Sequence, residues 1–269
     1  MFTLRNWISY NDFENDACNW YSLCKNPNAI QLILKYPQKI NWHALSYNEN
    51  AIDILTKNKD KIIWTNLSYN SGAIDLISQN LDKIDWNKLS SNPSAIHLLS
   101  QNLDKINWNM LSMNPNAMNL LTMMPDKIDW YKLSANPSAI NLLLQNFDKI
   151  SWYNLSLNPS AINILSQNIH KINWYNLSLN PSAINILSQN FDKISWHILS
   201  LNPCAIDILS NNIDKLNIFN LLQNANIFEI DYCSIKTRMN IYSEELMMRV
   251  LHPSRIQKMI DNGWEVDDF

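Results

Sequence analysis

A period of 22 residues runs through most of this 269-residue chain. It is clearest between residues 152 and 190, where the stretch WYNLSLNPSAINILSQN of 152–168 recurs letter for letter at 174–190. Tryptophans mark the register without insertion or deletion at Trp20, Trp42, Trp64, Trp86, Trp108, Trp130, Trp152, Trp174 and Trp196. A fixed period of this length is typical of repeat proteins, in which each copy packs against its neighbours.

Each copy is expected to form two short helices. We number the positions of a copy from 1, the tryptophan, to 22. Asn, Asp or Ser stands at position 22 in most copies, where it can cap a first helix that carries the tryptophan and the leucine at position 4. The Asn-Pro pair at positions 7 and 8 predicts a second helix, with Asn as N-cap and Pro in the first turn. Alanine at position 10, from Ala29 to Ala205, indicates close approach between helices.

The sequence therefore predicts an all-α fold, a right-handed α-solenoid of about nine to ten 22-residue two-helix repeats with N- and C-terminal caps. Residues 1–19 are expected to cap the first copy, 20–217 to form nine copies, 218–230 a degenerate repeat, and 231–269 a C-terminal helical cap. In that last part we expect Ser243 to open one helix, Pro253 to begin another and Gly263 to end it. Helices packed about 8–10 Å apart would make nine copies an elongated, curved body on the order of 80–100 Å long.

Composition argues against several classes of function. Glycine occurs only at Gly72 and Gly263, too rarely for the Gly-rich loops that bind nucleotide phosphates. The four cysteines form no CxxC pair, so we expect neither a disulfide framework nor a metal site. The net charge is −3 and no apolar run reaches membrane-spanning length, so we expect a soluble, intracellular protein. The histidines show no catalytic spacing, so neither a cofactor nor enzymatic activity is expected.

The repeat with its Trp and Asn-Pro, together with the closing segment EELMMRVLHPSRIQKMIDNG of 244–263, resembles tandem-repeat proteins of giant DNA viruses of amoebae. The resemblance covers essentially the whole chain. It implies a helical-repeat architecture and an intracellular life in the cytoplasm of an infected host cell, with association with the virion as an alternative. It transfers no catalytic residue and no biochemical activity.

One lysine stands at position 20 of each copy. If these side chains followed one groove, they could bind a single-stranded nucleic acid at one phosphate per copy. The competing interpretation is that each lysine lies in a solvated linker and pairs with the aspartate that precedes it in most copies. The candidate polyanion row consists of Lys61, Lys83, Lys105, Lys127, Lys149, Lys171 and Lys193.

Two other rows of residues have structural interpretations. Tryptophan at position 1, with leucine three residues later, is expected to lie in the core rather than to stack on bases. Serine at position 5, from Ser46 to Ser200, is expected to bond the backbone at the turn before Asn-Pro, since eight equivalent nucleophiles make no catalytic sense.

Positions that the repeat does not fix are the expected carriers of specificity. Positions 2, 3 and 6 vary, and the Tyr, His, Met and Leu residues among them suit a protein-binding face. The alternative is that several of these side chains complete the packing between copies. The candidate protein-binding residues are Tyr47, Tyr69, Met113, Tyr131, Tyr153, Tyr175 and His197.

The sequence thus predicts a non-enzymatic repeat scaffold that binds a protein partner, of host or viral origin, along an extended face. Single-stranded nucleic-acid binding through the lysine row is the first alternative, and a self-assembling structural protein is the second. Neither a membrane nor a metal is expected as a partner.

Overall fold

The computed structural model describes residues 2–9, 16–250 and 252–261, and it is predominantly helical. The chain divides into two compact units, one formed by Leu4–Phe228 and the other by Met1–Thr3 with Glu229–Phe269. The larger unit contains the first nine copies of the repeat and the tenth as far as Phe228. Two short strands, β1 (Phe2–Leu4) and β2 (Phe228–Ile230), pair in a two-stranded sheet that the sequence did not predict.

The predicted first helix is present in every copy. Its N-cap side chain at position 22 accepts from the first turn in most copies, as Asn41 does from the N–H of Ala44 at 3.0 Å, whereas Ile63 and Ser195 make no such bond. These first-row helices are α1 (Ala17–Lys25), α3 (Trp42–Leu45), α5 (Trp64–Leu67), α7 (Trp86–Ser90), α9 (Trp108–Ser112), α11 (Trp130–Leu133), α13 (Trp152–Leu155), α15 (Trp174–Leu179), α17 (Trp196–Leu199) and α19 (Ile218–Leu221).

The second α-helix begins at position 11 rather than at the predicted proline. The residues before it form a 3₁₀ turn, as in η2 (Pro27–Ala29), because the N–H at position 10 bonds the carbonyl of the Asn three residues earlier. Another 3₁₀ turn covers positions 18–20, as in η3 (Pro37–Lys39). The second-row helices are α2 (Ile30–Lys35), α4 (Ile52–Lys57), α6 (Ile74–Ser78), α8 (Ile96–Ser100), α10 (Met118–Met123), α12 (Ile140–Gln145), α14 (Ile162–Gln167), α16 (Ile184–Gln189) and α18 (Ile206–Ser210).

The core runs between the two rows of helices. In the first nine copies, leucine at position 4, alanine at position 10 and an aliphatic residue at position 14 are buried, for example Leu45, Ala51 and Leu55. The prediction for the tryptophans holds in part. Trp20 is buried, whereas the later tryptophans of the row are half-buried with part of the ring against the core.

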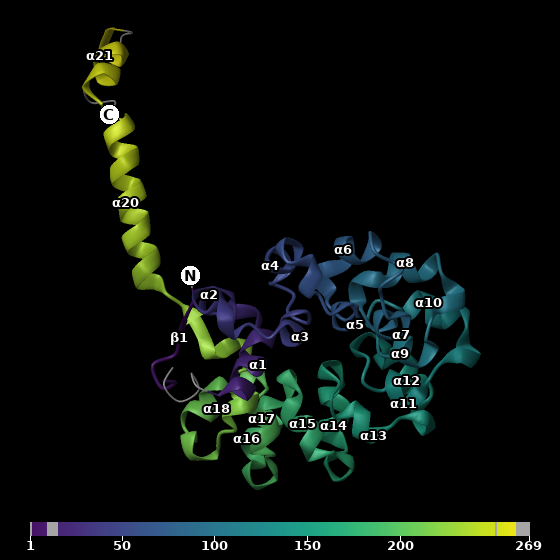
Figure 1. Cartoon of the computed structure of the whole chain (residues 1–269). Coiled ribbons are helices and arrows are strands. Elements are labelled where there is room, and N and C mark those ends of the chain that lie inside the picture. Colours follow the sequence, from purple (N-terminus) through teal and green to yellow (C-terminus); the bar gives the residue numbers. More distant parts are fainter. Residues whose placement is uncertain (1, 10–15, 251, 262–269) are drawn as a thin grey trace. The chain divides into compact units, whose positions relative to one another are not determined.

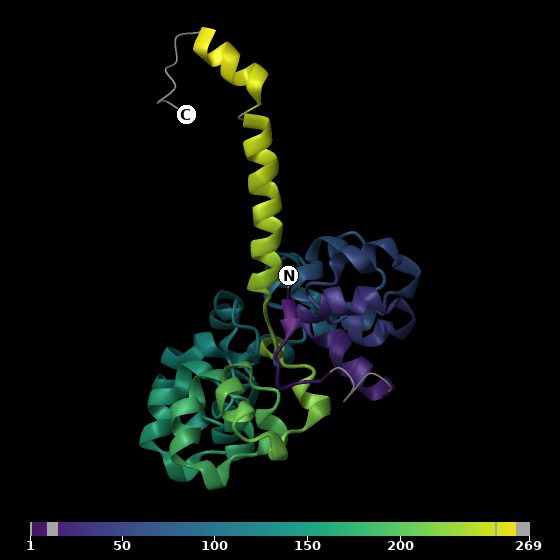
Figure 2. The ribbon, with the colours of Figure 1, turned by 90° about the vertical axis from the view of Figure 1, so that its left-hand side faces the viewer.

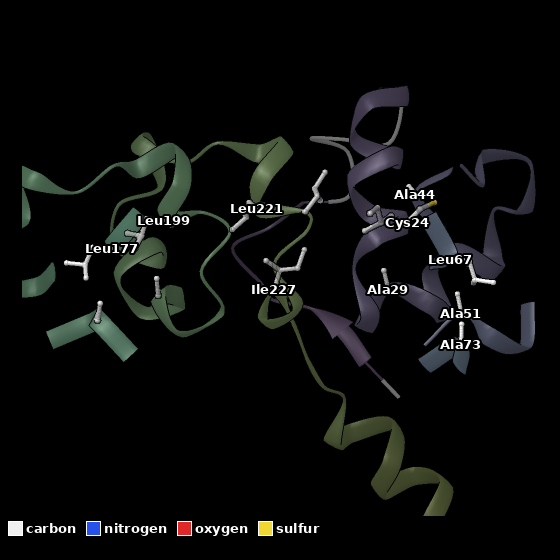
Figure 3. Close-up of a cluster of buried hydrophobic side chains, with 14 of the residues drawn as sticks. Cys24, Ala29, Ala44, Ala51, Leu67, Ala73, Leu177, Leu199, Leu221 and Ile227 are labelled. Atoms are coloured by element: carbon white, nitrogen blue, oxygen red, sulfur yellow. The ribbon is translucent and has the colours of Figure 1, made fainter. Parts of the chain in front are cut away.

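The copies curve as expected, but the expectation of an elongated body is wrong, because the first and tenth copies contact each other. Helix α1 packs against α19 as well as against α3, and η2 packs against η17 (Ala225–Ile227). In Figure 1 the first copies (purple) and the last (green) lie side by side, and in Figure 3 buried side chains line both sides of this junction, Leu221 and Ile227 on one and Cys24 and Ala29 on the other. The ten copies form a closed ring.

The direction of curvature follows from the packing of the two rows. First-row helices contact one another across copies, as α7 with α9 and α15 with α17, more extensively than second-row helices do. The more tightly packed row lies on the inside of a curve, and Figure 1 places α5, α7 and α9 toward the middle of the unit with α4, α6, α8 and α10 at its periphery. Ten copies in a full circle require a turn of about 36° per copy.

The N-terminal segment contacts the tenth copy. The backbone N–H of Arg5 donates to the carbonyl of Ile227 at 3.0 Å, and its Nε donates to the carbonyl of Asn226 at 2.7 Å. Trp7 and Ile8 line an apolar hollow of about 300 Å³ with side chains of residues 213–221. The two end faces that were expected to need caps therefore cover each other, and the N-terminal segment covers an edge of the tenth copy.

The smaller unit contains two helices, α20 (Tyr232–Val250) and α21 (Pro253–Asp261). The prediction that Ser243 opens a helix is wrong, because α20 passes through this residue without a break (Figure 2). The prediction that Pro253 begins a helix is confirmed. Gly263 lies outside the described residues.

Candidate protein-binding surface

The hydrogen bonds of the first-row helices show where each side chain points. These helices turn by about 100° per residue. Position 3 faces the preceding copy, because Asn66 Nδ2 donates to the carbonyl of His43 at 3.0 Å. Position 5 faces the next first-row helix, because Ser46 Oγ accepts at 3.1 Å from the N–H of Ile63, the N-cap residue of α5. Leucine at position 4 is buried against the second row, so positions 2 and 6, on the opposite side of the helix, point toward the middle of the ring.

We call the side chains at positions 2 and 6 the inner wall of the ring. All seven candidate protein-binding residues belong to it: Tyr131, Tyr153, Tyr175 and His197 at position 2, and Tyr47, Tyr69 and Met113 at position 6. Three tyrosines of consecutive copies are about half exposed, Tyr131 at 51%, Tyr153 at 47% and Tyr175 at 53%. Side chains that filled the middle of the ring would be buried, so these exposures show that solvent reaches the wall.

Aromatic side chains of neighbouring copies contact each other along the wall. The rings of Tyr131 and Tyr153 are nearly parallel, with centroids 6.3 Å apart. At the junction of the first and tenth copies, Tyr21 and Phe219 stack in the same way at 6.5 Å. The wall is therefore continuous across the point where the ring closes.

Two lysine side chains contact a second aromatic pair on the wall. Tyr47 and Tyr69 lie 6.0 Å apart between centroids. Lys25 Nζ lies 5.1 Å from the ring centroid of Tyr47, and Lys88 Nζ lies 5.7 Å from that of Tyr69. Burial raises the pKa of the Tyr69 phenol, with Tyr47 and Asp85 adding to the effect, so this side chain is a neutral hydrogen-bonding group at physiological pH.

A ladder of buried asparagines supports the wall from behind. At position 7, Asn48 Nδ2 donates to the carbonyls of Cys24 and Asn26 in the preceding copy, at 3.0 and 2.8 Å, and its Oδ1 accepts from the N–H of Asn50 at 3.0 Å. The same three bonds are made by Asn26, Asn70, Asn92, Asn114, Asn136, Asn158, Asn180, Asn202 and Asn224. The ladder continues around the whole ring, because Asn26 of the first copy donates to the carbonyls of Leu222 and Asn224 in the tenth copy, at 3.0 and 2.8 Å.

The capping role that the sequence predicted for these asparagines is confirmed, but their contact with the preceding copy was missed. A side chain that is uncharged, buried and invariant through ten copies is the signal that could have indicated it, since buried polar groups need partners. The serines at position 5 bond backbone, as predicted. Each joins the first helix of its copy to the residue that precedes the next first-row helix, as Ser134 does by donating to the carbonyl of Trp130 at 2.8 Å and accepting from the N–H of Ser151 at 2.9 Å.

The lysine row lies away from the inner wall. In seven copies the ammonium group lies over the indole ring of its own copy, with Nζ to centroid distances between 4.4 Å for Lys149 and 5.4 Å for Lys39. The expected pairing with the preceding aspartate is found at Lys193, whose Nζ lies 3.5 Å from Asp192. The aspartate interpretation was therefore wrong for most of the row, because the 3₁₀ turn at positions 18–20 directs the lysine back over the tryptophan.

Other kinds of site find little support within the described residues. No group of three or more His, Cys, Asp or Glu side chains there could hold a metal ion. No described helix combines the length and apolar character needed to cross a bilayer. An open hollow of about 390 Å³ beside Trp130 is lined by one acidic and one basic side chain, Asp126 and Lys149, together with Asn146 and apolar side chains.

Comparison with known proteins identifies no relative of this ring. No family model, no curated protein and no solved structure matches the chain.

Proposed function

We propose that the protein is a non-enzymatic scaffold that binds a protein partner on the inner wall of its ring. The observation that carries the proposal is the half-exposed row of Tyr131, Tyr153 and Tyr175, projecting from three consecutive helices of a hydrogen-bonded framework. Tyrosine provides a large contact area with few rotatable bonds and a hydroxyl group, and it is enriched among the residues that dominate binding energy at protein interfaces.

The position of the lysines favours this proposal over nucleic-acid binding. A single strand that stacked on the tyrosines would need cations beside them to neutralise its phosphates. Five of the seven lysines in the candidate row, Lys61, Lys83, Lys105, Lys149 and Lys171, instead lie over tryptophans, which are not part of the inner wall. Single-stranded nucleic-acid binding through Lys61 to Lys193 remains the alternative, and it predicts an affinity that falls steeply with salt.

The experiment compares capture of proteins by three immobilised variants of the full chain. The test variant replaces Tyr131, Tyr153 and Tyr175 with Ser, and the control replaces Leu144, which is 51% exposed on the second-row helix α12, with Ser. A partner held by the wall is retained by wild type and by the control. The test variant should bind it at least ~30-fold more weakly, because a single interface tyrosine of this kind contributes about 2 kcal/mol.

Two results would contradict the proposal. Equal retention of the same proteins by all three variants would exclude the inner wall as the binding surface. Loss of every captured component on nuclease treatment, together with a steep salt dependence, would establish the nucleic-acid alternative. Captures are therefore performed with and without nuclease and at several salt concentrations.

The biological setting of the proposal comes from the sequence resemblance. The partner is then a viral or host protein in the cytoplasm of an infected cell, and the copies keep the right-handed winding expected of them. Self-assembly is the second alternative. Sedimentation over a concentration series distinguishes it, because the scaffold proposed here binds its partner as a single ring.

A further inference from the structure

The inner wall surrounds an opening of limited width. Neighbouring aromatic rings on it lie 6.0, 6.3 and 6.5 Å apart between centroids. Ten such spacings give a circumference of about 60–65 Å and, divided by π, a diameter of about 20 Å between opposite side chains. The estimate from helix packing agrees, because ten axes about 8–10 Å apart give a circle roughly 25–32 Å across from which side chains project inward.

This width decides which form of protein can reach the wall. A folded domain of 100 residues has a radius of gyration of about 13 Å, so it is wider than the opening. An α-helix is about 10–12 Å across with its side chains, and an extended chain is narrower. A partner therefore reaches the inner wall as a segment of polypeptide.

The chemistry of the wall changes around the ring. One arc, which we call the apolar arc, consists of Tyr131, Tyr153 and Tyr175 at position 2 with Leu157, Leu179 and Leu201 at position 6. None of these six side chains is charged, and all are at least partly exposed. Elsewhere the wall presents polar side chains such as Lys25, Asn87 and Asn109. A segment on the apolar arc is complementary to it when its own side chains there are apolar and uncharged.

The spacing of the copies along the wall distinguishes between conformations of the segment. Two residues of an extended chain advance about 6.4–6.8 Å, and alternate side chains point to the same face. This advance matches the 6.0–6.5 Å between neighbouring rings. One turn of α-helix advances only about 5.4 Å, so a helix lying along the wall falls out of register within a few copies. A base inserted between two rings needs about 6.8 Å between their planes, more than the centroid spacing allows without movement.

We infer that the apolar arc binds an extended, uncharged polypeptide segment with an apolar side chain at every second residue, one for each copy of the repeat. This inference rests on the proposed protein-binding function and names the form of the partner. The segment follows the arc across Tyr131, Tyr153 and Tyr175, so three copies hold about six residues.

The test is a selection of twelve-residue peptides from a random phage-displayed library on the intact full-length chain. Parallel selections use the variant with Tyr131, Tyr153 and Tyr175 replaced by Ser and the outer-surface control Leu144→Ser. We expect enriched peptides on wild type and on the control, with apolar residues at alternate positions and few charges. Synthetic copies of the best peptides should bind the triple variant at least tenfold more weakly.

The other outcomes count against the inference. Peptides that depend on the tyrosines but show apolar residues three and four apart would refute the extended register, while the inner wall would still bind protein. Enrichment that is the same on the triple variant, or no enrichment above an empty surface, would overturn the inference. The capture experiment described above then decides separately whether a protein partner uses the wall.

Discussion

The asparagine that closes the ladder offers a sharp test of the ring. Asn26 makes three hydrogen bonds with its side chain, to the carbonyls of Leu222 and Asn224 at 3.0 and 2.8 Å and from the N–H of Asn28 at 3.0 Å. The residue is fully buried. At about 1 kcal/mol for each bond, Asn26→Ala should lower the free energy of unfolding by about 3 kcal/mol, with a further cost for carbonyls left without a donor.

Asn136→Ala is the matched control, because it lies in the middle of the array. Its bonds to Ser112 and Asn114 and from Ser138 have lengths of 3.0, 2.8 and 2.9 Å, nearly those of Asn26. In a closed ring the two substitutions therefore destabilise the protein equally. In an open solenoid Asn26 would have no preceding copy, so its loss would cost only the cap bond, about 1 kcal/mol.

The assay is urea unfolding followed by tryptophan fluorescence, with circular dichroism as a second probe. Equal shifts of the unfolding midpoint for Asn26→Ala and Asn136→Ala would support the closed ring. A shift for Asn26→Ala that is a third or less of the shift for Asn136→Ala would refute the reasoning about closure.

Three further predictions concern stability. Leu133→Ala should cost about 2–5 kcal/mol because Leu133 is fully buried, whereas Tyr131→Ala, on the exposed wall, should change stability by less than about 1 kcal/mol in the same urea assay. Lys105→Ala should lower the free energy of unfolding by at most about 1 kcal/mol, because the Lys105 Nζ lies 4.7 Å from the centroid of Trp86 at an exposed site. In thermal melts, the control Lys105→Arg, which keeps the positive charge, should retain the stability of wild type. Burial raises the pKa of the Cys24 thiol, so wild type should lose stability relative to Cys24→Ser as pH rises above about 8.5, where the unfolded thiol ionises; a constant difference from pH 7 to 9.5 would contradict this.

The local structure was predictable because each copy contains its own signals. The residues at position 22 and the Asn-Pro pairs fix where helices begin, and the spacing of Leu45, Ala51 and Leu55 fixes which side chains are buried. The candidate binding residues were found because they vary within a repeat that is otherwise constant. Their common location on the inner wall follows from helix periodicity once the neighbours of positions 3 and 5 are known.

Closure of the ring was not predictable from the period. The turn of about 36° per copy arises from a small difference in packing between the two rows of helices, and the 22 residues of one copy do not encode that difference in a readable pattern. The available signal was indirect: Leu221 and Asn224 keep their repeat positions in a tenth copy that has lost its tryptophan and proline. Leu221 lies on α19, which packs against α1 of the first copy, and the carbonyl of Asn224 accepts from Asn26 of that copy.

The contacts of the lysines could not be predicted from adjacency in the sequence. In sequence, Asp148 and Lys149 are adjacent, which favours an ion pair, whereas Lys149 and Trp130 are separated by most of a copy. The 3₁₀ turn η10 (Phe147–Lys149) nevertheless directs the Lys149 side chain toward Trp130. Its Nζ lies 4.4 Å from the Trp130 centroid. Proximity along the chain was a poor guide because the backbone turn decides the direction of the side chain.

The closed ring itself is tested most directly by the separation of its first and tenth copies in solution. Spin labels at positions 21 and 219, in a chain whose native cysteines are replaced by Ser, report this separation through dipolar broadening of the electron paramagnetic resonance spectrum. The Tyr21 and Phe219 rings lie 6.5 Å apart between centroids, so a closed ring predicts strong broadening, lost when urea unfolds the chain. A spectrum under native conditions identical to the sum of the two singly labelled proteins would contradict closure.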